Sequence, residues 1–565
     1  MQKIKLVVSL FLILLVQGVY QWTVNQPRDA GPDVPAGKLR SLSFAPFREG
    51  YNPLEEIYPI PEHIEEDMRL LADKTESIRT YSSVGGMEPT PDTARKYGLK
   101  MIQGAWLGSD LIMNRNEINA LIKSANTHPD VVDRVIVGNE VLLRGDMNVD
   151  RLIDYIREVK RAVNQPVSYA DVWSMYMKYP QLIKEVDFIT IHILPYWEDE
   201  PISVENAGAH LEKIVKQVED QARGLAPGKP ILIGESGWPS AGRQRGPAIP
   251  SVLNAAKYVR GMIQVVNHHG FDYNIVEAFN QPWKSSLEGV VGANWGLLSA
   301  DRQPVFPLTG PVLEHSQWQS HFLEASLLWL FIAACYFKTL QAMPLLRGAL
   351  FLILAQMLCV CLIDMWHFLW YTSYNIWQRG YTVIIVILNV ALGGLILRRS
   401  ADILSNAPGI LILAERLRLF YFLFIALALF DTYGLAFNGR YMSFPVEQFL
   451  IPVVGICALM LFLCIQQRRL NNRILSFDQL TGWNLHTHRD RLIVYFIGFA
   501  IVGMIIGETE AFMSSRDFIL AHPGFFEGLP VALGYTLHNR QLLAWLACLF
   551  ILSLSFWRNI DRAAE

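Results

Sequence analysis

The sequence predicts an α/β protein in which a (β/α)8 TIM barrel over residues 38–312 is followed by an all-α bundle of transmembrane helices over 321–557. In the first half, short β-rich apolar segments alternate with amphipathic helical segments, and long apolar runs follow residue 320. Composition agrees, because 52% of the 565 residues are hydrophobic and the mean hydropathy is +0.23, both high for a soluble enzyme.

The N-terminus carries Lys3 and Lys5 before an apolar run at 6–24, which is about long enough to span a bilayer. No clear small-x-small cleavage site follows this run. We therefore expect an N-terminal signal anchor over residues 1–24, with a cleaved signal peptide as the alternative. Residues 25–37, with three prolines and two glycines, predict a linker.

Eight strand segments are expected in the barrel, at 39–47, 76–82, 100–107, 134–140, 166–172, 188–196, 230–238 and 274–283. Helical segments are expected between them, at 59–74, 115–127, 149–164, 203–225 and 251–268. Eight strand–helix repeats in about 270 residues have the size and rhythm of a TIM barrel. A doubly wound sheet is the alternative, but no G-x-G-x-x-G follows the first strand.

Two glutamates end predicted strands on opposite sides of this barrel. The fourth strand ends in Gly138-Asn139-Glu140, and the seventh contains Gly234-Glu235 near its end. The chemistry of a TIM barrel lies at the C-terminal ends of its strands, so both carboxylates should face one mouth. Glycoside hydrolysis requires such a pair, about 5–5.5 Å apart for retention and roughly 6.5–9.5 Å apart for inversion of configuration.

These motifs resemble a known family. VGNE at 137–140 and GESGWPS at 234–240 resemble the two signatures of glycoside hydrolase family 17, the β-1,3-glucanases and related transglycosylases. Supporting similarities are IRTYSS at 78–83, GAWLG at 104–108, EAFNQPWK at 277–284 and, for the bacterial branch, NWGLLSADRQPVFPLTG at 294–310. The resemblance implies that Glu140 is the acid/base, that Glu235 is the nucleophile, and that Asn139 hydrogen-bonds the sugar 2-hydroxyl.

Further substrate-binding residues are expected at or just beyond the strand ends. Aromatic rings stack on the apolar faces of sugars, and five aromatic residues are candidates: Tyr81, Trp106, Trp197, Trp238 and Trp283. Arg79 could orient Glu235 or pair with a structural acid. The sixth strand has Leu194 where the family often has an aromatic residue, and we expect Tyr196 to orient the nucleophile.

The sequence predicts neither a metal nor a cofactor. All six cysteines lie after residue 330, inside apolar runs, where they resemble small buried hydrophobic residues. The pair His268-His269 consists of helix neighbours, which do not face each other. The net charge of −3, with no basic stripe, argues against a nucleic-acid partner.

Seven spans are expected after the barrel, at 321–337, 348–370, 380–397, 419–437, 446–465, 492–509 and 541–557. One set of connecting loops holds most of the arginines: Arg398, Arg399, Arg416, Arg418, Arg468, Arg469, Arg473, Arg489, Arg491, Arg558 and Arg562. The alternate loops hold only Arg379, Arg440, Arg516 and Arg540. Positive loops lie on the cytoplasmic side, so about eight spans, cytoplasmic termini including a tail at 558–565, and an extracytoplasmic barrel are expected.

The predicted function is that of a membrane-anchored, retaining β-glucan transglycosylase in the inner membrane, with its barrel in the periplasm. A β-1,3-glucanase is the alternative within the enzyme class, and a glucan-binding or export component is the alternative outside it. The expected partners are a β-glucan chain, the lipid bilayer and a glucan synthase. The longest predicted cytoplasmic loop, about 466–491, is too short to be a sugar-nucleotide transferase domain.

Overall fold

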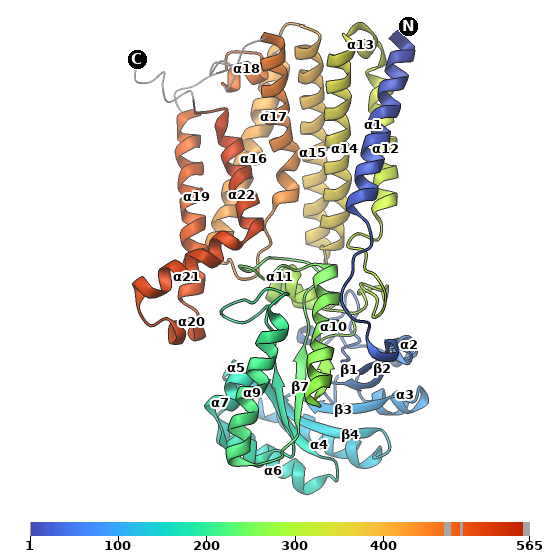
Figure 1. Cartoon of the computed structure of the whole chain (residues 1–565), viewed down its shortest axis with the longest axis vertical. Helices are drawn as coiled ribbons and strands as arrows, with labels where there is room; N and C mark the ends of the chain where they lie inside the picture. The colour runs from blue at the N-terminus through green and yellow to red at the C-terminus, as the bar shows by residue number, and fades with distance from the viewer. Residues whose placement is uncertain (1, 468–475, 486–489, 558–565) are drawn as a thin grey trace. The chain divides into compact units, whose positions relative to one another are not determined.

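Eight parallel strands close into a barrel in the order β1 to β8, which confirms the predicted fold (Figure 1). The computed structural model describes residues 2–467, 476–485 and 490–557. The strands are β1 Leu39–Ser43, β2 Thr75–Arg79, β3 Lys100–Ala105, β4 Val132–Asn139, β5 Val167–Val172, β6 Ile189–His192, β7 Ile231–Ser236 and β8 Asp272–Ile275. All eight lie within or overlap the predicted segments.

The strands form where β-branched residues are concentrated. Every residue of β7 is buried, and the apolar residues of β4 are buried along its whole length. Parallel strands covered on both faces have this nearly continuous apolar character. Most strands are shorter than predicted at their C-terminal ends, because the chain there leaves the ladder and forms the loops that carry the polar site residues.

Helices cover the outside of the barrel, and the five predicted ones are α2 Pro61–Leu71, α4 Leu111–Thr127, α6 Val149–Ala162, α9 Ala207–Leu225 and α10 Val252–His269. In α6, Leu152, Ile156 and Val159 are buried along one face. Its N-terminus is capped by Asn148, whose side chain accepts a hydrogen bond from the Arg151 amide. Asp110 caps α4 in the same way.

The strand register becomes irregular near the polar strand ends. Shifts occur between Ile136 and Asn139 in the β4–β5 pair, between Ile191 and His192 in the β6–β7 pair, and between Ile233 and Ser236 in the β7–β8 pair. Such irregularities re-aim side chains and are common beside active sites. They coincide here with both glutamates and with the end of β6.

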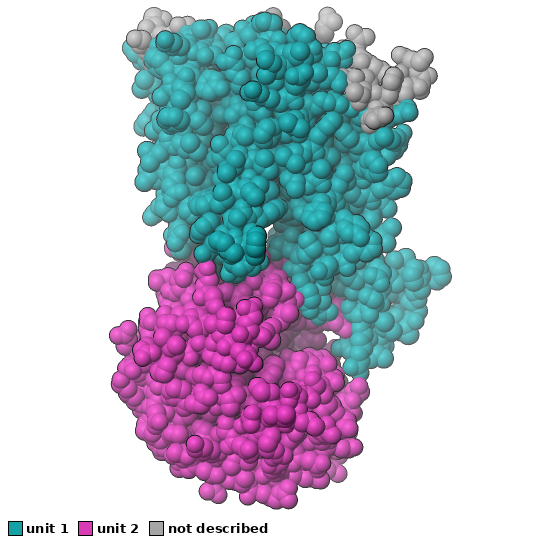
Figure 2. Space-filling model, turned by 180° about the vertical axis from the view of Figure 1, so that it is seen from behind, with its two compact units in different colours: residues 1–26, 315–565 teal, residues 27–314 magenta. Residues whose placement is uncertain are grey.

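The chain divides into two compact units, coloured separately in Figure 2. One unit comprises residues 27–314 and contains the barrel. The other comprises residues 1–26 and 315–565, so the N-terminal helix α1 Gln2–Val24 belongs with the helices that follow the barrel. Each unit has its own large cluster of buried apolar side chains.

The helical unit contains the predicted apolar segments as long helices: α12 Trp318–Cys335, α14 Leu345–Tyr371, α15 Ile376–Leu404, α16 Leu411–Phe437, α17 Val446–Gln467, α19 Asp490–Met513 and α22 Arg540–Leu554. Within the described residues, six helices are long and apolar enough to cross a membrane, namely α1, α14, α15, α16, α17 and α19. A seventh span results if α21 Phe525–His538 and α22, which meet at a 74° bend, count as one. The predicted span at 321–337, now α12, is not among them.

Part of the topology prediction lies outside the described residues. Six of the arginines used for it belong there: Arg468, Arg469, Arg473, Arg489, Arg558 and Arg562. The predicted tail at 558–565 lies there as well. The orientation of the bundle therefore stays a prediction from the sequence.

Candidate active site

The fourth strand delivers Glu140 through a strained turn. Gly138 has φ +87°, and a Cβ at this position would approach the Val141 side chain to 2.8 Å. Glu140 itself has φ 52°, a left-handed conformation that is unfavourable for a residue with a side chain. The Glu140 amide donates to the carbonyl of Ala170 at 2.8 Å, which ties the turn to β5. Strain of this kind is concentrated at functional sites.

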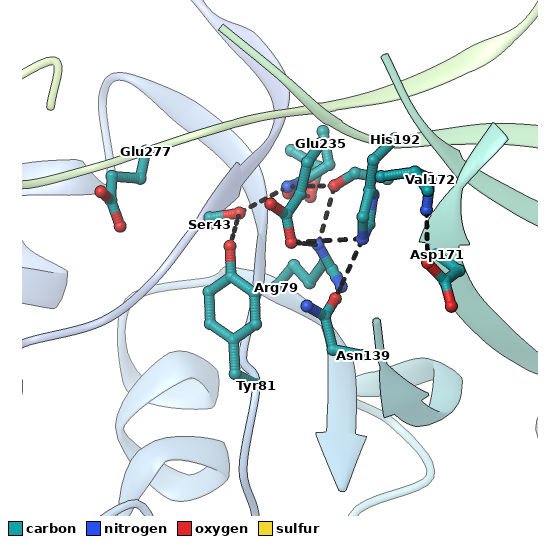
Figure 3. A network of polar contacts seen from close by, with 12 residues as sticks. Ser43, Arg79, Tyr81, Asn139, Asp171, Val172, His192, Glu235 and Glu277 are labelled. Carbon is teal, nitrogen blue, oxygen red and sulfur yellow. Dashed lines mark hydrogen bonds and ion pairs between the residues drawn. The ribbon is translucent and has the colours of Figure 1, made fainter. Parts of the chain in front are cut away.

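The seventh strand delivers Glu235 into the barrel interior, where it is 8% exposed. Arg79, at the end of β2, donates from Nη1 to Glu235 Oε1 at 2.9 Å (Figure 3). His192 Nε2 lies 3.4 Å from the same oxygen. A buried carboxylate is stable only with such partners. Of the two roles expected for Arg79, orienting Glu235 or pairing with a structural acid, the contact fits the first.

The two glutamates are close enough for retaining chemistry. One carboxylate oxygen of Glu140, one of Glu235 and a ring nitrogen of His192 all lie within 4.8 Å of one another. This approach fits the retaining separation of about 5–5.5 Å better than the wider inverting separation.

The surroundings drive the pKa values of the two carboxyl groups apart. Burial, the charge of Glu235 and the charge of Asp171 raise the pKa of Glu140 to about 8. Burial also favours a higher pKa for Glu235, but the adjacent Arg79, which is charged and hydrogen-bonded to the carboxylate, outweighs it and holds the pKa below its usual value. At neutral pH one carboxyl group is therefore protonated and the other ionised, which is the division that an acid and a nucleophile require.

Arg79 also fixes the orientation of Asn139. Its Nη2 donates to Asn139 Oδ1, and its Nη1 additionally donates to the Gly234 carbonyl at 2.9 Å. His192 Nε2 lies 3.1 Å from the same Asn139 oxygen. With its oxygen engaged in this way, Asn139 has its amide N–H groups available to donate, as the family resemblance implies for a sugar hydroxyl.

The predicted aromatic residues divide by exposure. Tyr81 is partly buried and donates to Ser43 Oγ at 3.1 Å, with the Arg79 guanidinium 4.9 Å from its ring centre. Trp106 is 43% exposed, and the Arg144 guanidinium lies 4.4 Å from its ring centre. These two rings can therefore serve a ligand at the mouth.

Trp197 and Trp283 are also partly buried, and each is held by neighbours. Trp197 stacks on Trp295 with ring centres 6.3 Å apart. Trp283 donates from its indole nitrogen to Gln281 Oε1 at 3.0 Å and meets Phe47 edge-on. Both rings retain accessible surface for a ligand.

Trp238 and Tyr196 differ from expectation. Trp238 is 1% exposed and donates to the Ile249 carbonyl at 2.9 Å, so its ring belongs to the core rather than to a sugar platform. Tyr196 is fully buried, and its hydroxyl donates to the Arg243 carbonyl at 2.5 Å. A phenol has one hydrogen to donate, so Tyr196 cannot also orient Glu235 by donation.

Several ionisable residues of the site were not singled out from the sequence. His192 and Asp171 are buried at the ends of β6 and β5. Glu277 is buried in the EAFNQPWK motif and contacts Lys284 Nζ at 3.0 and 3.2 Å, and burial raises its pKa to about 7. His192, Asp171 and Glu277 each lie inside a predicted strand segment, and the observed strands end at or within two residues of them, so earlier strand ends would have been the usable signal.

Only one group of described residues has the composition and spacing for a metal ion, namely Glu140, His192 and Glu235. Arg79 lies 2.9 Å from Glu235 and places a permanent positive charge against this group, which opposes a cation. The expectation of a metal-free reaction therefore stays a prediction.

Comparisons with known proteins match the barrel residues to glycoside hydrolases. The family profile of the BtgE/BtgC glycoside hydrolase domain matches residues 42–296. A glucan 1,3-β-glucosidase of Arthroderma benhamiae is 28% identical over 257 residues, which are 43% of this chain and 82% of the relative. A glucan 1,3-β-glucosidase of Schizosaccharomyces pombe is 29% identical over 250 residues, 40% of this chain and 75% of the relative.

A solved structure, a glycoside hydrolase family 17 β-1,3-glucanosyltransferase from Rhizomucor miehei, is 30% identical and covers 48% of this chain and 96% of its own, with a TM-score of 0.41. The fold and the paired carboxylates define a glycoside hydrolase. More particularly, residues 42–296 form a domain of the BtgE/BtgC glycoside hydrolase type, which is family 17-like. The helical unit lies outside the matched residues.

Proposed function

We propose that this protein is a membrane-attached, retaining β-1,3-glucan glucanosyltransferase with Glu235 as the nucleophile and Glu140 as the acid/base. The observation that carries the proposal is the pair itself: close oxygens, one carboxyl group with a raised pKa and one with a lowered pKa. The names of the relatives support a β-1,3-glucan as the substrate.

In the first half-reaction, Glu235 attacks the anomeric carbon while Glu140 gives its proton to the leaving oxygen. The glycosidic bond breaks, and a covalent glycosyl-enzyme forms as the shortened glucan departs. In the second half-reaction, Glu140, now ionised, takes a proton from an incoming hydroxyl, whose oxygen displaces Glu235. A sugar hydroxyl gives transfer and water gives hydrolysis.

Transfer is the favoured outcome because a multi-helix attachment suits remodelling of glucan made at a membrane by a glucan synthase. Hydrolysis is the second candidate, since the Arthroderma and Schizosaccharomyces relatives are named glucosidases. Incubation of the purified protein with laminaripentaose separates the two. Products longer than the pentaose support transfer, and exclusively shorter products establish a hydrolase.

We further propose that the apolar helices cross the cytoplasmic membrane and hold the barrel outside it. The six long apolar helices support the spanning role, and the arginine-rich loops support the orientation. Alkaline carbonate should leave the protein in the membrane pellet. Protease added to right-side-out vesicles should release a fragment that contains the barrel, and a barrel protected from the protease would mean the opposite orientation. Release of the protein from the membrane by alkaline carbonate would contradict the spanning role.

A further inference from the structure

His192 closes the sixth strand beside the proposed nucleophile. Across the β6–β7 pair its Cα is the register partner of the Glu235 Cα. Paired residues on neighbouring strands point to the same face, so both side chains enter the barrel interior. The imidazole is 1% exposed. Gly234 provides the room, since a Cβ there would lie 3.1 Å from His192 Cε1 and 3.2 Å from Nδ1.

The contacts of the ring determine its tautomer. Nε2 forms a 3.1 Å hydrogen bond with Asn139 Oδ1 and lies 3.4 Å from Glu235 Oε1. Arg79 also donates to this Asn139 atom, which identifies the atom as the amide oxygen. Both neighbours of Nε2 are therefore acceptors, and Nε2 must carry the hydrogen. Figure 3 shows the contacts from this ring nitrogen to Asn139 and Glu235 as dashed lines.

The other ring nitrogen has a different environment. Nδ1 is buried and has no hydrogen-bond partner among the described residues. Within the described part of the chain, no carboxylate is a hydrogen-bond partner of Nδ1 that could stabilise a second proton, and the charged groups that act on the ring are Glu235 and Arg79. Burial lowers the pKa of His192 to about 4. The imidazole is therefore neutral at neutral pH and does not form a proton relay with a carboxylate behind it.

We propose that His192 is a positioning residue: its Nε2–H group donates to Asn139 Oδ1 and fixes that amide, and the same N–H lies 3.4 Å from Glu235 Oε1 and helps to hold the carboxylate in place for attack. The inference rests on the proposed function of Glu235. It assigns to His192 the orienting role expected for Tyr196, whose hydroxyl is bound to the Arg243 carbonyl. Since Arg79 and His192 both act on Oε1, Oε2 is the oxygen we expect to attack the sugar.

A matched pair of variants tests this role. In His192→Gln, the side-chain amide can place an N–H group near the position of Nε2. His192→Met has similar length but no donor, and His192→Leu is a second donor-less variant. The measurement is the pH profile of kcat/KM on laminaripentaose, with thermal unfolding as the check on folding.

We expect the donor-less variants to lose about tenfold or more in kcat/KM and to shift the acidic limb upward by about one pH unit, because the ionised form of Glu235 loses the N–H dipole that lies beside Oε1. His192→Gln should restore most of the rate and the original limb. Ile191→Val, in the same strand, controls for altered packing and should leave the limb unmoved.

Equal losses in the Gln and Met variants with an unmoved acidic limb would overturn the positioning role and leave His192 as packing. Glu235→Gln, measured in parallel, separates this result from failure of the proposed function. If Glu235→Gln keeps its activity, the assignment of Glu235 as the nucleophile is wrong, whatever the His192 variants show. If Glu235→Gln is inactive and the His192 profiles coincide with wild type, only the role of His192 falls.

Discussion

Replacement of Glu140 by glutamine tests the division of labour between the two carboxyl groups. The pKa of Glu140 is raised from 4.5 to about 8. At pH 6.5 a carboxyl group with that pKa is about 97% protonated, whereas one with the ordinary value is about 1% protonated. The structure thus raises the population of the acid form by about 100-fold. Glutamine keeps the shape of the side chain but has no proton to give.

We expect Glu140→Gln to lower kcat/KM on laminaripentaose by about 10²–10⁴-fold, or roughly 3–5 kcal/mol of transition-state stabilisation. The basic limb of the wild-type profile, near pH 8, should disappear, because activity there is lost as Glu140 deprotonates. The acidic limb should remain, because Glu235 must be ionised in both proteins.

A substrate with a good leaving group gives the sharper result. An aryl β-glucoside needs no acid for its first step, so Glu140→Gln should still form the glycosyl-enzyme, and added azide should rescue turnover as a β-glycosyl azide. Glu117→Gln is the matched control, since Glu117 is a buried glutamate of the same barrel that binds Ser82 and the Ser83 amide. Near-normal activity of Glu140→Gln on the pentaose, or an α-azide product, would refute the assignment.

Three further predictions follow from the site. Asp171→Asn removes a charge that raises the pKa of Glu140, so the basic limb should move to lower pH while the acidic limb stays; an unmoved basic limb contradicts this electrostatic link. Trp106→Ala should raise KM for laminaripentaose by about tenfold with little change in Tm, whereas Trp238→Ala should cost about 3–5 kcal/mol of unfolding free energy in denaturant titrations. Chelators should leave activity unchanged, and a loss that zinc or magnesium restores would show that Glu140, His192 and Glu235 hold a metal despite Arg79.

The fold was predictable because its signals are local. In β7, the run Ile231, Leu232 and Ile233 predicts a buried strand, and the Gly234-Glu235 that follows predicts its polar end. In helix α6, the apolar residues that form the buried face recur with the helical period in the sequence. The two glutamates follow from the same logic, since residues that end parallel strands of a barrel meet at one mouth.

The rest of the site depends on packing between distant segments, which no local pattern records. Trp238 and Trp106 both follow strand ends, yet one lies in the core and the other is half-exposed. Tyr196 turns its hydroxyl to Arg243, a residue from the loop after β7. The bend between α21 and α22 likewise falls at His538–Arg540. Hydropathy alone predicts the span at 541–557, which corresponds to α22, and misses the helix α21 before the bend.

The neutrality of His192 fits the demands on a nucleophile that must later leave. Arg79 already gives Glu235 a permanent positive neighbour at 2.9 Å. A second full positive charge would lower the basicity of the carboxylate further and weaken its attack on the sugar. A neutral N–H group orients the same oxygen with a smaller loss of basicity, because its interaction is that of a dipole. Arg79 thus supplies the charge that keeps Glu235 ionised, the His192 N–H dipole adds to this effect, and both side chains aim the carboxylate.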